Sequence, residues 1–393
     1  MQRIYLDHAS TTPMDKRVIS AMLPFFNTQF GNPSSLHQEG KKAEVEMNKN
    51  RGEISKLMGA MPENIIFTGG GTESDNLAIF GVAKAHAQHG KHIISSPIEH
   101  HAVLNSLEEL KKWGWDIAYI KPDAKGIIKA EDVINAIRPD TVLVSIMYAN
   151  NEIGSINPIA GIGRQILQYR KNNKTNYPLF HVDACQAAGY LDLDVEKLHV
   201  DLMAISGSKI YGPKGVGALY VRRGVKIQPI IFGGEQERHL RAGTENTAGI
   251  AGLAKAMQLV INEREKESKR IGELSRYLWQ QIQKQIPNVK LNGPDIGPER
   301  LSNNLNITFR GIEGEALLLY LDEYGIMCST GSACAAKSLE PSHVLKALGM
   351  QPQEARGAIR FSLGHDNTKK DIDYLMKYLP AIVEQLRQIA KMK

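Results

Sequence analysis

The chain has 393 residues, of which 42% are hydrophobic and 23% are charged, and its formal net charge is +6. This length allows a large core and two domains, whereas no stretch reaches the roughly 18 to 20 apolar residues that a membrane span requires. The positive charge forms no basic tract interleaved with aromatic residues, so we expect no direct nucleic-acid partner, although it suits docking of an acidic carrier protein.

The beginning of the chain and its cysteines bear on the cellular compartment. Residues 1–8 contain no apolar signal-peptide core, so we do not expect export. The cysteines, Cys185, Cys328 and Cys334, are too few and too scattered for a disulfide framework. We therefore expect a reducing cytoplasm, in which a thiolate remains available for chemistry.

Short apolar runs alternate with amphipathic segments through the first two-thirds of the chain. The apolar runs predict strands at residues 64–68, 92–96, 117–120, 141–147, 179–183, 202–206 and 216–221. Between them the pattern predicts helices near residues 73–88, 102–113, 130–137 and 159–171. This alternation predicts an α/β fold with a mostly parallel sheet, in which ligands bind at the carboxyl ends of the strands.

The pattern changes after residue 234. A long charged helix is predicted over residues 247–285 as a connector to a smaller α/β region. In that region we expect strands at residues 304–309 and 358–363 and helices at residues 313–324 and 368–391. The expected division is a large domain over residues 15–255 and a small domain over residues 256–393, completed by residues 1–14.

A glycine-rich turn follows the first predicted strand and opens the first predicted helix. Residues 67–76 read Phe-Thr-Gly-Gly-Gly-Thr-Glu-Ser-Asp-Asn. Glycines permit close backbone approach, and a helix amino terminus offers N–H groups and partial positive charge to a phosphate. The turn lacks the signatures of dinucleotide and nucleoside-triphosphate sites. A plain tight turn remains the alternative.

Further polar groups follow two other predicted strands. His100 and His101 follow residues 92–96, where an imidazole can stack on a flat cofactor and relay protons; a helix cap or a surface pair is the alternative. No cluster of ligands surrounds these histidines in the sequence, so a metal is not indicated. Asn151 follows residues 141–147 and can donate to a cofactor hydroxyl or simply serve a turn.

Asp183 ends one predicted strand, and Lys209 follows the next one. An aspartate at the end of a buried strand requires a positive partner, which in a pyridoxal 5'-phosphate (PLP) enzyme is the protonated ring nitrogen. Gln186 can then donate to the phenolic oxygen of the ring. Lys209 lies in a glycine-rich stretch, where burial frees an amine for Schiff-base formation. An exposed aspartate and a solvated lysine are the alternatives, but the order of the two residues suits PLP.

These motifs resemble those of cysteine desulfurases of the NifS/IscS type, which have the aspartate-aminotransferase fold (fold type I) and belong to the class V aminotransferases. The resemblance runs nearly end to end, from residues 7–13 (Asp-His-Ala-Ser-Thr-Thr-Pro) and 31–37 to residues 360–364 (Arg-Phe-Ser-Leu-Gly). Its most specific segment, residues 329–345, is similar to the loop that carries the family's catalytic cysteine. The resemblance implies PLP as the cofactor, a seven-stranded, mostly parallel sheet in the large domain, and a smaller α/β domain.

The resemblance also implies roles for individual residues. Lys209 would hold the cofactor and move protons, and His100 would stack on its ring as an acid–base group. Asp183 would face the ring nitrogen, and Arg360 would clamp the substrate carboxylate with Asn151 nearby. The other implied cofactor contacts are Gly71, Thr72 and Ser206 at the phosphate, Gln186 and Asn151 at the phenolic oxygen, and Thr244, which the family supplies from a neighbouring subunit and which implies a homodimer.

One position departs from the family pattern. Ser208 precedes Lys209, where the family commonly has a histidine that contacts the phosphate. Serine keeps a hydroxyl donor but loses a possible positive charge, which weakens the phosphate assignment at this position.

The implied activity is conversion of L-cysteine to L-alanine. Cys334, as a thiolate, would take the sulfur as a persulfide and pass it to an acceptor protein of iron–sulfur cluster assembly or tRNA thiolation. An inert loop thiol is the alternative for Cys334. Alternative functions are a selenocysteine lyase, another PLP-dependent lyase or aminotransferase, and a weakly active docking scaffold. We expect Cys328 in buried packing and assign no role to Cys185.

Overall fold

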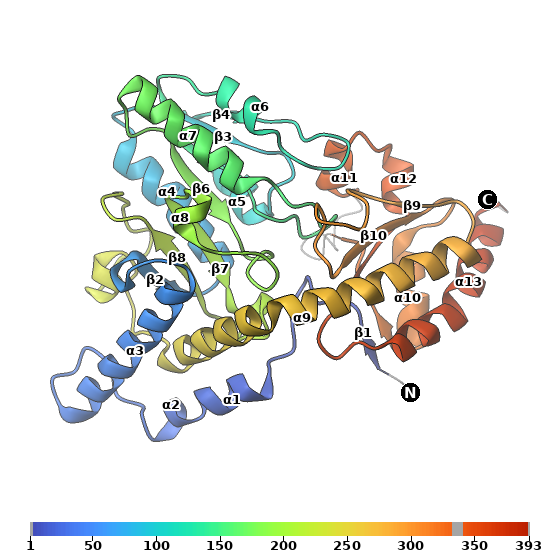
Figure 1. Cartoon of the computed structure of the whole chain (residues 1–393), viewed down its shortest axis with the longest axis horizontal. Coiled ribbons are helices and arrows are strands. Elements are labelled where there is room, and N and C mark those ends of the chain that lie inside the picture. The colour runs from blue at the N-terminus through green and yellow to red at the C-terminus, as the bar shows by residue number, and fades with distance from the viewer. Residues whose placement is uncertain (1–2, 332–340, 392–393) are drawn as a thin grey trace.

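The computed structural model describes residues 3–331 and 341–391, whose arrangement is shown in Figure 1. A large sheet with its helices occupies one end of the molecule, and a small sheet with other helices occupies the opposite end. Helix α9 (Thr247–Gln285) runs along one side from the large sheet to the small one. The marked chain ends both lie at the end with the small sheet.

The large sheet confirms the predicted α/β fold with a mostly parallel seven-stranded sheet. In spatial order its strands are β2 (Ile65–Thr68), β8 (Gly217–Val221), β7 (Leu202–Ser206), β6 (Leu179–Asp183), β5 (Thr141–Ser145), β3 (His92–Ser95) and β4 (Asp116–Tyr119). Strand β8 runs in the direction opposite to the other six strands of this sheet. The apolar runs therefore located every strand of the large sheet.

Helices cover both faces of the large sheet. They are α4 (Gly71–His86), α5 (His101–Lys112), α6 (Ala130–Asn135), α7 (Ile159–Asn173) and α8 (Val195–Leu198). Side chains alternate along a strand, so Ile66 packs in the core with α4 and α5, whereas Phe67 packs in the core with α7 and the first half of α9. Because both faces are buried, the strands read as continuous apolar runs.

Three helices before β2 were not predicted from the sequence. They are α1 (Lys16–Met22), α2 (Pro24–Asn27) and α3 (Gln38–Leu57). Helix α3 packs against α9 and buries Ala43, Met47 and Ile54 along one side. Most of its other side chains are polar or charged, so its apolar stripe is too sparse to stand out in the sequence.

The small sheet is antiparallel, in the order β12 (Ala358–Ser362), β10 (Asn304–Phe309) and β9 (Val289–Leu291). Its core includes side chains from the second half of α9 and from Cys328, which is buried there as expected. The remaining elements are α10 (Gly314–Glu323), α11 (His343–Ala347), α12 (Pro352–Arg356), α13 (Lys369–Lys391) and the 3₁₀ turns η1 (Pro62–Asn64), η2 (Gly207–Lys209) and η3 (Gln236–His239). Strand β1 (Ile4–Tyr5) pairs in parallel with β11 (Ile326–Met327) as a separate two-stranded sheet, and a bridge from Asp7 to Ser362 joins the start of the chain to β12.

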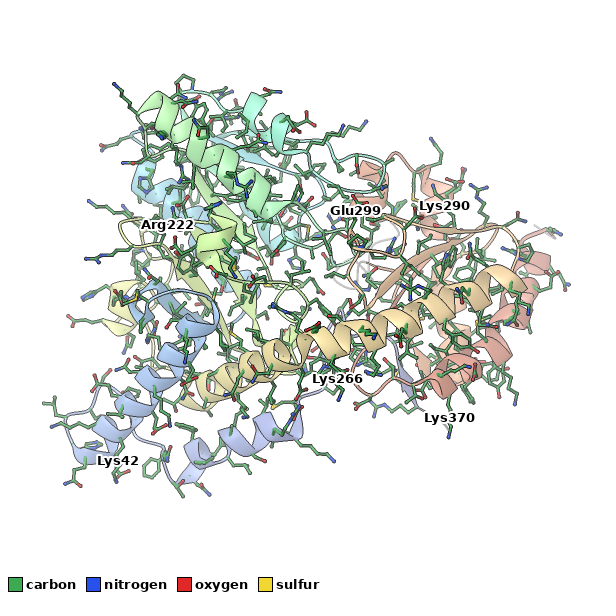
Figure 2. All side chains as sticks on the ribbon, in the orientation of Figure 1. Lys42, Arg222, Lys266, Lys290, Glu299 and Lys370 are labelled. Carbon is green, nitrogen blue, oxygen red and sulfur yellow. The ribbon has the colours of Figure 1, made fainter. Side chains whose placement is uncertain are left out.

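Basic side chains project from elements at both ends of the molecule. Lys42 on α3, Lys266 on α9 and Lys370 on α13 extend outward in Figure 2. Each of these three side chains is exposed. Among the residues described, no helix combines the length and the apolar character that crossing a membrane requires.

Candidate active site

A cavity of about 790 Å³ opens where β2, β3, β5, β6 and β7 end. Every predicted site residue that the structure describes, except Thr244, lines it. Ser10 from the N-terminal segment and Arg360 from β12 also face it, so the cavity lies between the two sheets. The carboxyl ends of the strands in a parallel sheet are the expected ligand position.

The glycine-rich turn leads from β2 into α4 at one side of this cavity. Gly70 has a φ of +146°, a conformation that favours glycine. Gly71 begins α4, and a Cβ atom there would lie 2.5 Å from Cys185 Sγ, so only glycine allows this close approach. Thr72 belongs to the first turn, whose backbone N–H groups have no partners within a helix. The start of α4 therefore offers donors to an anion.

Lys209 reaches the cavity from η2, directly after β7. Its Nζ donates hydrogen bonds to the carbonyl oxygens of Ala9, at 3.2 Å, and of Ser10. Beside it, the Oγ atoms of Ser206 and Ser208 are 3.2 Å apart and both residues line the cavity. Lys209 is therefore held against the N-terminal segment rather than solvated in a surface turn.

Asp183 ends β6 and is 5% exposed. Its carboxylate accepts a hydrogen bond from the backbone N–H of Cys185 at 2.9 Å. Gln186 donates through Nε2 to the carbonyl oxygen of Ala9 at 2.8 Å, so its amide is bonded to the N-terminal segment in this structure. Asp183 thus presents a buried negative charge to a cavity that also contains Lys209.

His100 caps α5 and faces the cavity. Its Nδ1 accepts a hydrogen bond from the backbone N–H of Ala102 at 3.1 Å, so this nitrogen carries no proton. Burial lowers the pKa of the His100 imidazole, and the nearby Asp183 opposes that shift. His100 is therefore both the N-cap of α5 and part of the cavity lining. His101 packs edge-on against the ring of His343, with centroids 4.6 Å apart.

Two buried carboxyl groups beside the site were missed by sequence reasoning. Glu99 accepts hydrogen bonds from Ser96 Oγ at 2.5 Å and from the backbone N–H of Met147 at 3.0 Å, and burial raises its pKa to about 8. Glu152 accepts a hydrogen bond from Ser342 Oγ at 2.5 Å, and burial raises its pKa as well. Their only sequence signal is adjacency, because they neighbour the predicted residues His100 and Asn151.

A buried aspartate–histidine pair lies between α4 and β6. Asp75 Oδ1 is 3.5 Å from His181 Nε2, and His181 Nδ1 is 2.9 Å from Ser145 Oγ. Burial raises the pKa of Asp75 well above its usual value and lowers the pKa of His181 to about 4. Burial therefore disfavours the charged form of both Asp75 and His181.

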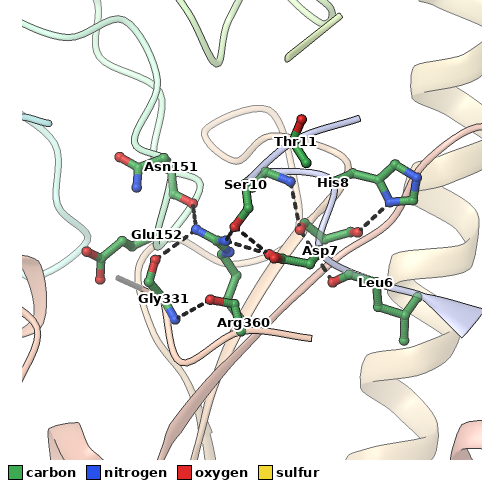
Figure 3. Close-up of polar contacts among 12 residues, drawn as sticks. Leu6, Asp7, His8, Ser10, Thr11, Asn151, Glu152, Gly331 and Arg360 are labelled. Carbon is green, nitrogen blue, oxygen red and sulfur yellow. Dashed lines mark hydrogen bonds and ion pairs between the residues drawn. The ribbon is translucent and has the colours of Figure 1, made fainter. Parts of the chain in front are cut away.

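Arg360 is the centre of a hydrogen-bond network at the other side of the cavity (Figure 3), and it is only 1% exposed. Its Nη2 donates to Asp7 Oδ1 and to Ser10 Oγ, each at 2.7 Å. Its Nη1 donates to the carbonyl oxygens of Asn151, at 3.0 Å, and of Gly331, at 2.9 Å. The guanidinium predicted to clamp a substrate carboxylate is thus already engaged.

Among the predicted site residues that the structure describes, Thr244 alone does not line the cavity. Thr244 is exposed on the segment after η3, and Cys334 lies outside the described residues. Cys185 lines the cavity, where burial raises the pKa of its thiol. Within residues 3–331 and 341–391, no group of three or more histidine, cysteine or acidic side chains is arranged to hold a metal ion.

The chain matches a known protein family over almost its whole length. The sequence profile of that family, Aminotransferase class-V, matches residues 4–375. The chain belongs to the class-V aminotransferase family. This family, including its cysteine desulfurases, is PLP-dependent.

Relatives of this family cover the chain from end to end. Cysteine desulfurase IscS of Dictyoglomus turgidum is 48% identical over 392 residues, which is 100% of this chain and 97% of that protein. Cysteine desulfurase IscS of Methanosarcina thermophila is 47% identical over 387 residues, 98% of this chain and 93% of that one. The solved structure of a NifS-like protein aligns with a TM-score of 0.90 at 38% identity, covering 98% of this chain and 100% of that one. A structure of SspA in complex with cysteine aligns with a TM-score of 0.80 at 38% identity, covering 92% of this chain and 98% of that one.

The donor set around the cavity fits PLP. The start of α4 and the neighbouring hydroxyls of Ser206 and Ser208 suit a phosphate. The amine of Lys209 suits an aldehyde, and the buried carboxylate of Asp183 suits a protonated pyridine nitrogen. The three kinds of group line the same cavity, as a single cofactor requires.

Proposed function

We propose that this chain is a cysteine desulfurase, which converts L-cysteine to L-alanine and carries the released sulfur as a persulfide on Cys334. The observation that carries the proposal is the single cavity lined by Lys209, Asp183, His100 and Arg360. Relatives named cysteine desulfurase support it, because they match the chain over nearly its full length.

We assign the cofactor contacts to residues on the large-sheet side of the cavity. Lys209 would bind the PLP aldehyde carbon through Nζ, and Asp183 would hold the proton on the ring nitrogen. His100 would lie against the ring. The phosphate contacts would be Gly71, Thr72, Ser206 and Ser208, and the contacts near the phenolic oxygen would be Gln186 and Asn151. When bound, PLP supplies an electron sink for negative charge that develops at the substrate α-carbon.

Arg360 and Asn151 would orient the substrate through its carboxylate. This directs the α-carbon toward Lys209, whose Nζ would take the α-proton. His100 would be neutral near pH 7 because burial lowers its pKa, and its one ring proton would lie on Nε2 because Nδ1 accepts a hydrogen bond from Ala102. His100 Nε2 is therefore the atom we assign to proton transfer.

The sulfur step balances within the substrate and one cysteine. The Cys334 thiolate attacks the substrate sulfur, so an S–S bond forms while the substrate C–S bond breaks. The electron pair of the C–S bond stays with the carbon fragment, which takes up protons and leaves as alanine. Cys334 is left as a persulfide, and no external oxidant enters the step.

We further propose a homodimer with shared active sites. Thr244 supports this, because the resembling family contacts phosphate from this motif in the neighbouring subunit and Thr244 is exposed on the single chain. An acceptor protein of iron–sulfur cluster assembly or tRNA thiolation would receive the sulfur. The reducing cytoplasm is the proposed compartment, because the chemistry needs Cys334 as a thiolate.

We also propose that residues 15–255 form the large domain and that residues 256–393 with residues 1–14 form the small one. The large sheet and the small sheet have different hydrophobic cores, which supports this division. Leu253 of α9 packs in the core of the large sheet, whereas Ile271 of the same helix packs in the core of the small sheet.

The test is alanine release from L-cysteine by the purified holoenzyme with a reductant, recorded together with visible absorbance. We expect a yellow protein that forms alanine, and a Lys209→Ala variant that loses both the covalent cofactor signal and turnover. Asp192→Asn, on a side chain about half exposed and paired with Lys197, is the matched control and should retain both. A yellow wild-type protein that cleaves selenocysteine but not cysteine would instead identify a selenocysteine lyase. A chain that takes up no PLP would refute the proposal.

A further inference from the structure

The N-terminal motif at residues 7–13 has no role in the proposed function so far, yet it runs through the active site. The carbonyl oxygen of Ala9 accepts hydrogen bonds from Lys209 Nζ at 3.2 Å and from Gln186 Nε2 at 2.8 Å. The carbonyl oxygen of Ser10 also accepts from Lys209 Nζ. The same segment therefore touches residues assigned to the cofactor and residues assigned to the substrate.

The N–H groups of the terminal nitrogens of Arg360 are all engaged before a substrate carboxylate binds. As Figure 3 shows, Nη1 and Nη2 each make two hydrogen bonds, and the partners are Asn151, Gly331, Asp7 and Ser10. Nη1 and Nη2 have no further N–H donors, and the buried Nε has no partner within the described residues. A carboxylate that binds a guanidinium through two parallel hydrogen bonds needs at least one terminal nitrogen. It must therefore displace existing partners of Arg360.

Asp7 and Ser10 are the partners best suited to leave. Nη1 is bonded to backbone carbonyls, and that of Asn151 is also fixed by Asn304 Nδ2 at 3.3 Å. The Asp7 side chain is 18% exposed and accepts a hydrogen bond from Ser10 Oγ at 2.8 Å, a bond that it can keep after leaving Arg360. Replacing one carboxylate by another also preserves the charge balance of the buried guanidinium.

We propose that Asp7 is a built-in competitor of the substrate, whose carboxylate occupies the face of Arg360 that receives the substrate carboxylate. Binding is then an exchange of one carboxylate for another, which weakens affinity for amino acids while the site still requires their carboxylate. This inference rests on the proposed function, because Arg360 is taken as the substrate-carboxylate residue. Asp7 is a specificity-determining residue and takes part in no bond-making step.

The test measures binding of L-alanine, the expected product, to the holoenzyme by absorbance titration. Asp7→Asn removes the competing charge but keeps the size of the side chain. We expect the Kd of L-alanine to fall about tenfold, which corresponds to about 1.4 kcal/mol, and the KM for L-cysteine to fall with it. The Kd of ethylamine, which lacks the carboxylate, should stay unchanged. Asp192→Asn carries the same charge change on an exposed side chain and should leave both constants unchanged.

Folding of the variants is checked by their melting temperature and cofactor absorbance. If Asp7→Asn does not fold, Asp7→Ser is also neutral and must tighten L-alanine binding in the same direction. Weaker or unchanged L-alanine binding in a folded neutral variant would overturn the proposal and assign Asp7 to holding Arg360 in place. A wild-type enzyme that forms no alanine from cysteine would instead refute the proposed function. The comparison of L-alanine with ethylamine would still test the exchange of carboxylates in that case.

Discussion

Replacing Glu237 by glutamine should destabilise the large sheet and the segment that carries Thr244. The Glu237 side chain is 1% exposed and pairs with Arg51, whose side chain is 8% exposed, through contacts of 2.7 and 2.8 Å. It also accepts a hydrogen bond from the backbone N–H of Phe67 on β2 at 2.9 Å. Removing one partner of a buried ion pair costs about 3–5 kcal/mol because the other charge is left unpaired. Glutamine keeps one acceptor, so we expect about 3 kcal/mol.

The assay is guanidinium denaturation followed by tryptophan fluorescence and circular dichroism. Glu263→Gln is the matched control, because Glu263 pairs with Arg17 at the surface, where the side chains are 34% and 47% exposed. An exposed pair contributes less than about 1 kcal/mol, so this variant should unfold close to the wild type. If Glu237→Gln and Glu263→Gln shift the midpoint equally, the buried pair does not anchor this segment and the reasoning is wrong.

Two further predictions concern the glycine turn and a buried histidine. Gly71→Ala should lower PLP affinity at least about tenfold in a cofactor titration, because the added Cβ would lie 2.5 Å from Cys185 Sγ. Adding Cys185→Ala should recover most of the lost affinity, and a double variant that binds PLP no better than Gly71→Ala would contradict the steric reason. Burial lowers the pKa of His8 to about 4, so below about pH 6.5 protons favour the unfolded chain, in which the imidazole is accessible. Between pH 7 and pH 5 this histidine should lower the free energy of unfolding of the wild type by about 2 kcal/mol. The loss in His8→Gln over the same range should be smaller by that amount. Equal losses in the two proteins would show that His8 is protonated in the folded chain.

The sequence predicted the large sheet well because its strands are buried on both faces and form unbroken apolar runs. It also predicted α9 over residues 247–285, where the structure has Thr247–Gln285. Helix α3 was not predicted because its buried positions, such as Met47 and Ile54, are separated by charged residues. Local patterns therefore located elements with dense apolar signals and missed elements such as α3, whose apolar signal is sparse.

The site was predictable where it depends on residues that follow successive strands. Asp183 and Lys209 come at the ends of β6 and β7, and the parallel sheet brings such positions to one edge. The contact of Asp7 with Arg360 was not predictable, since the two residues are 353 positions apart and no local pattern relates them. The roles of the site residues remain predictions. Cys334 itself lies outside the described residues.

The most direct test of the proposed function compares Cys334→Ala with Cys328→Ala under a single turnover of L-cysteine. Cys328 is buried in the small-sheet core and serves as the matched cysteine control. We predict that the wild type and Cys328→Ala form one alanine and one protein-bound persulfide per site. Cys334→Ala should keep the yellow cofactor but form neither. Alanine and persulfide formed by Cys334→Ala at the wild-type rate would contradict the proposed sulfur transfer.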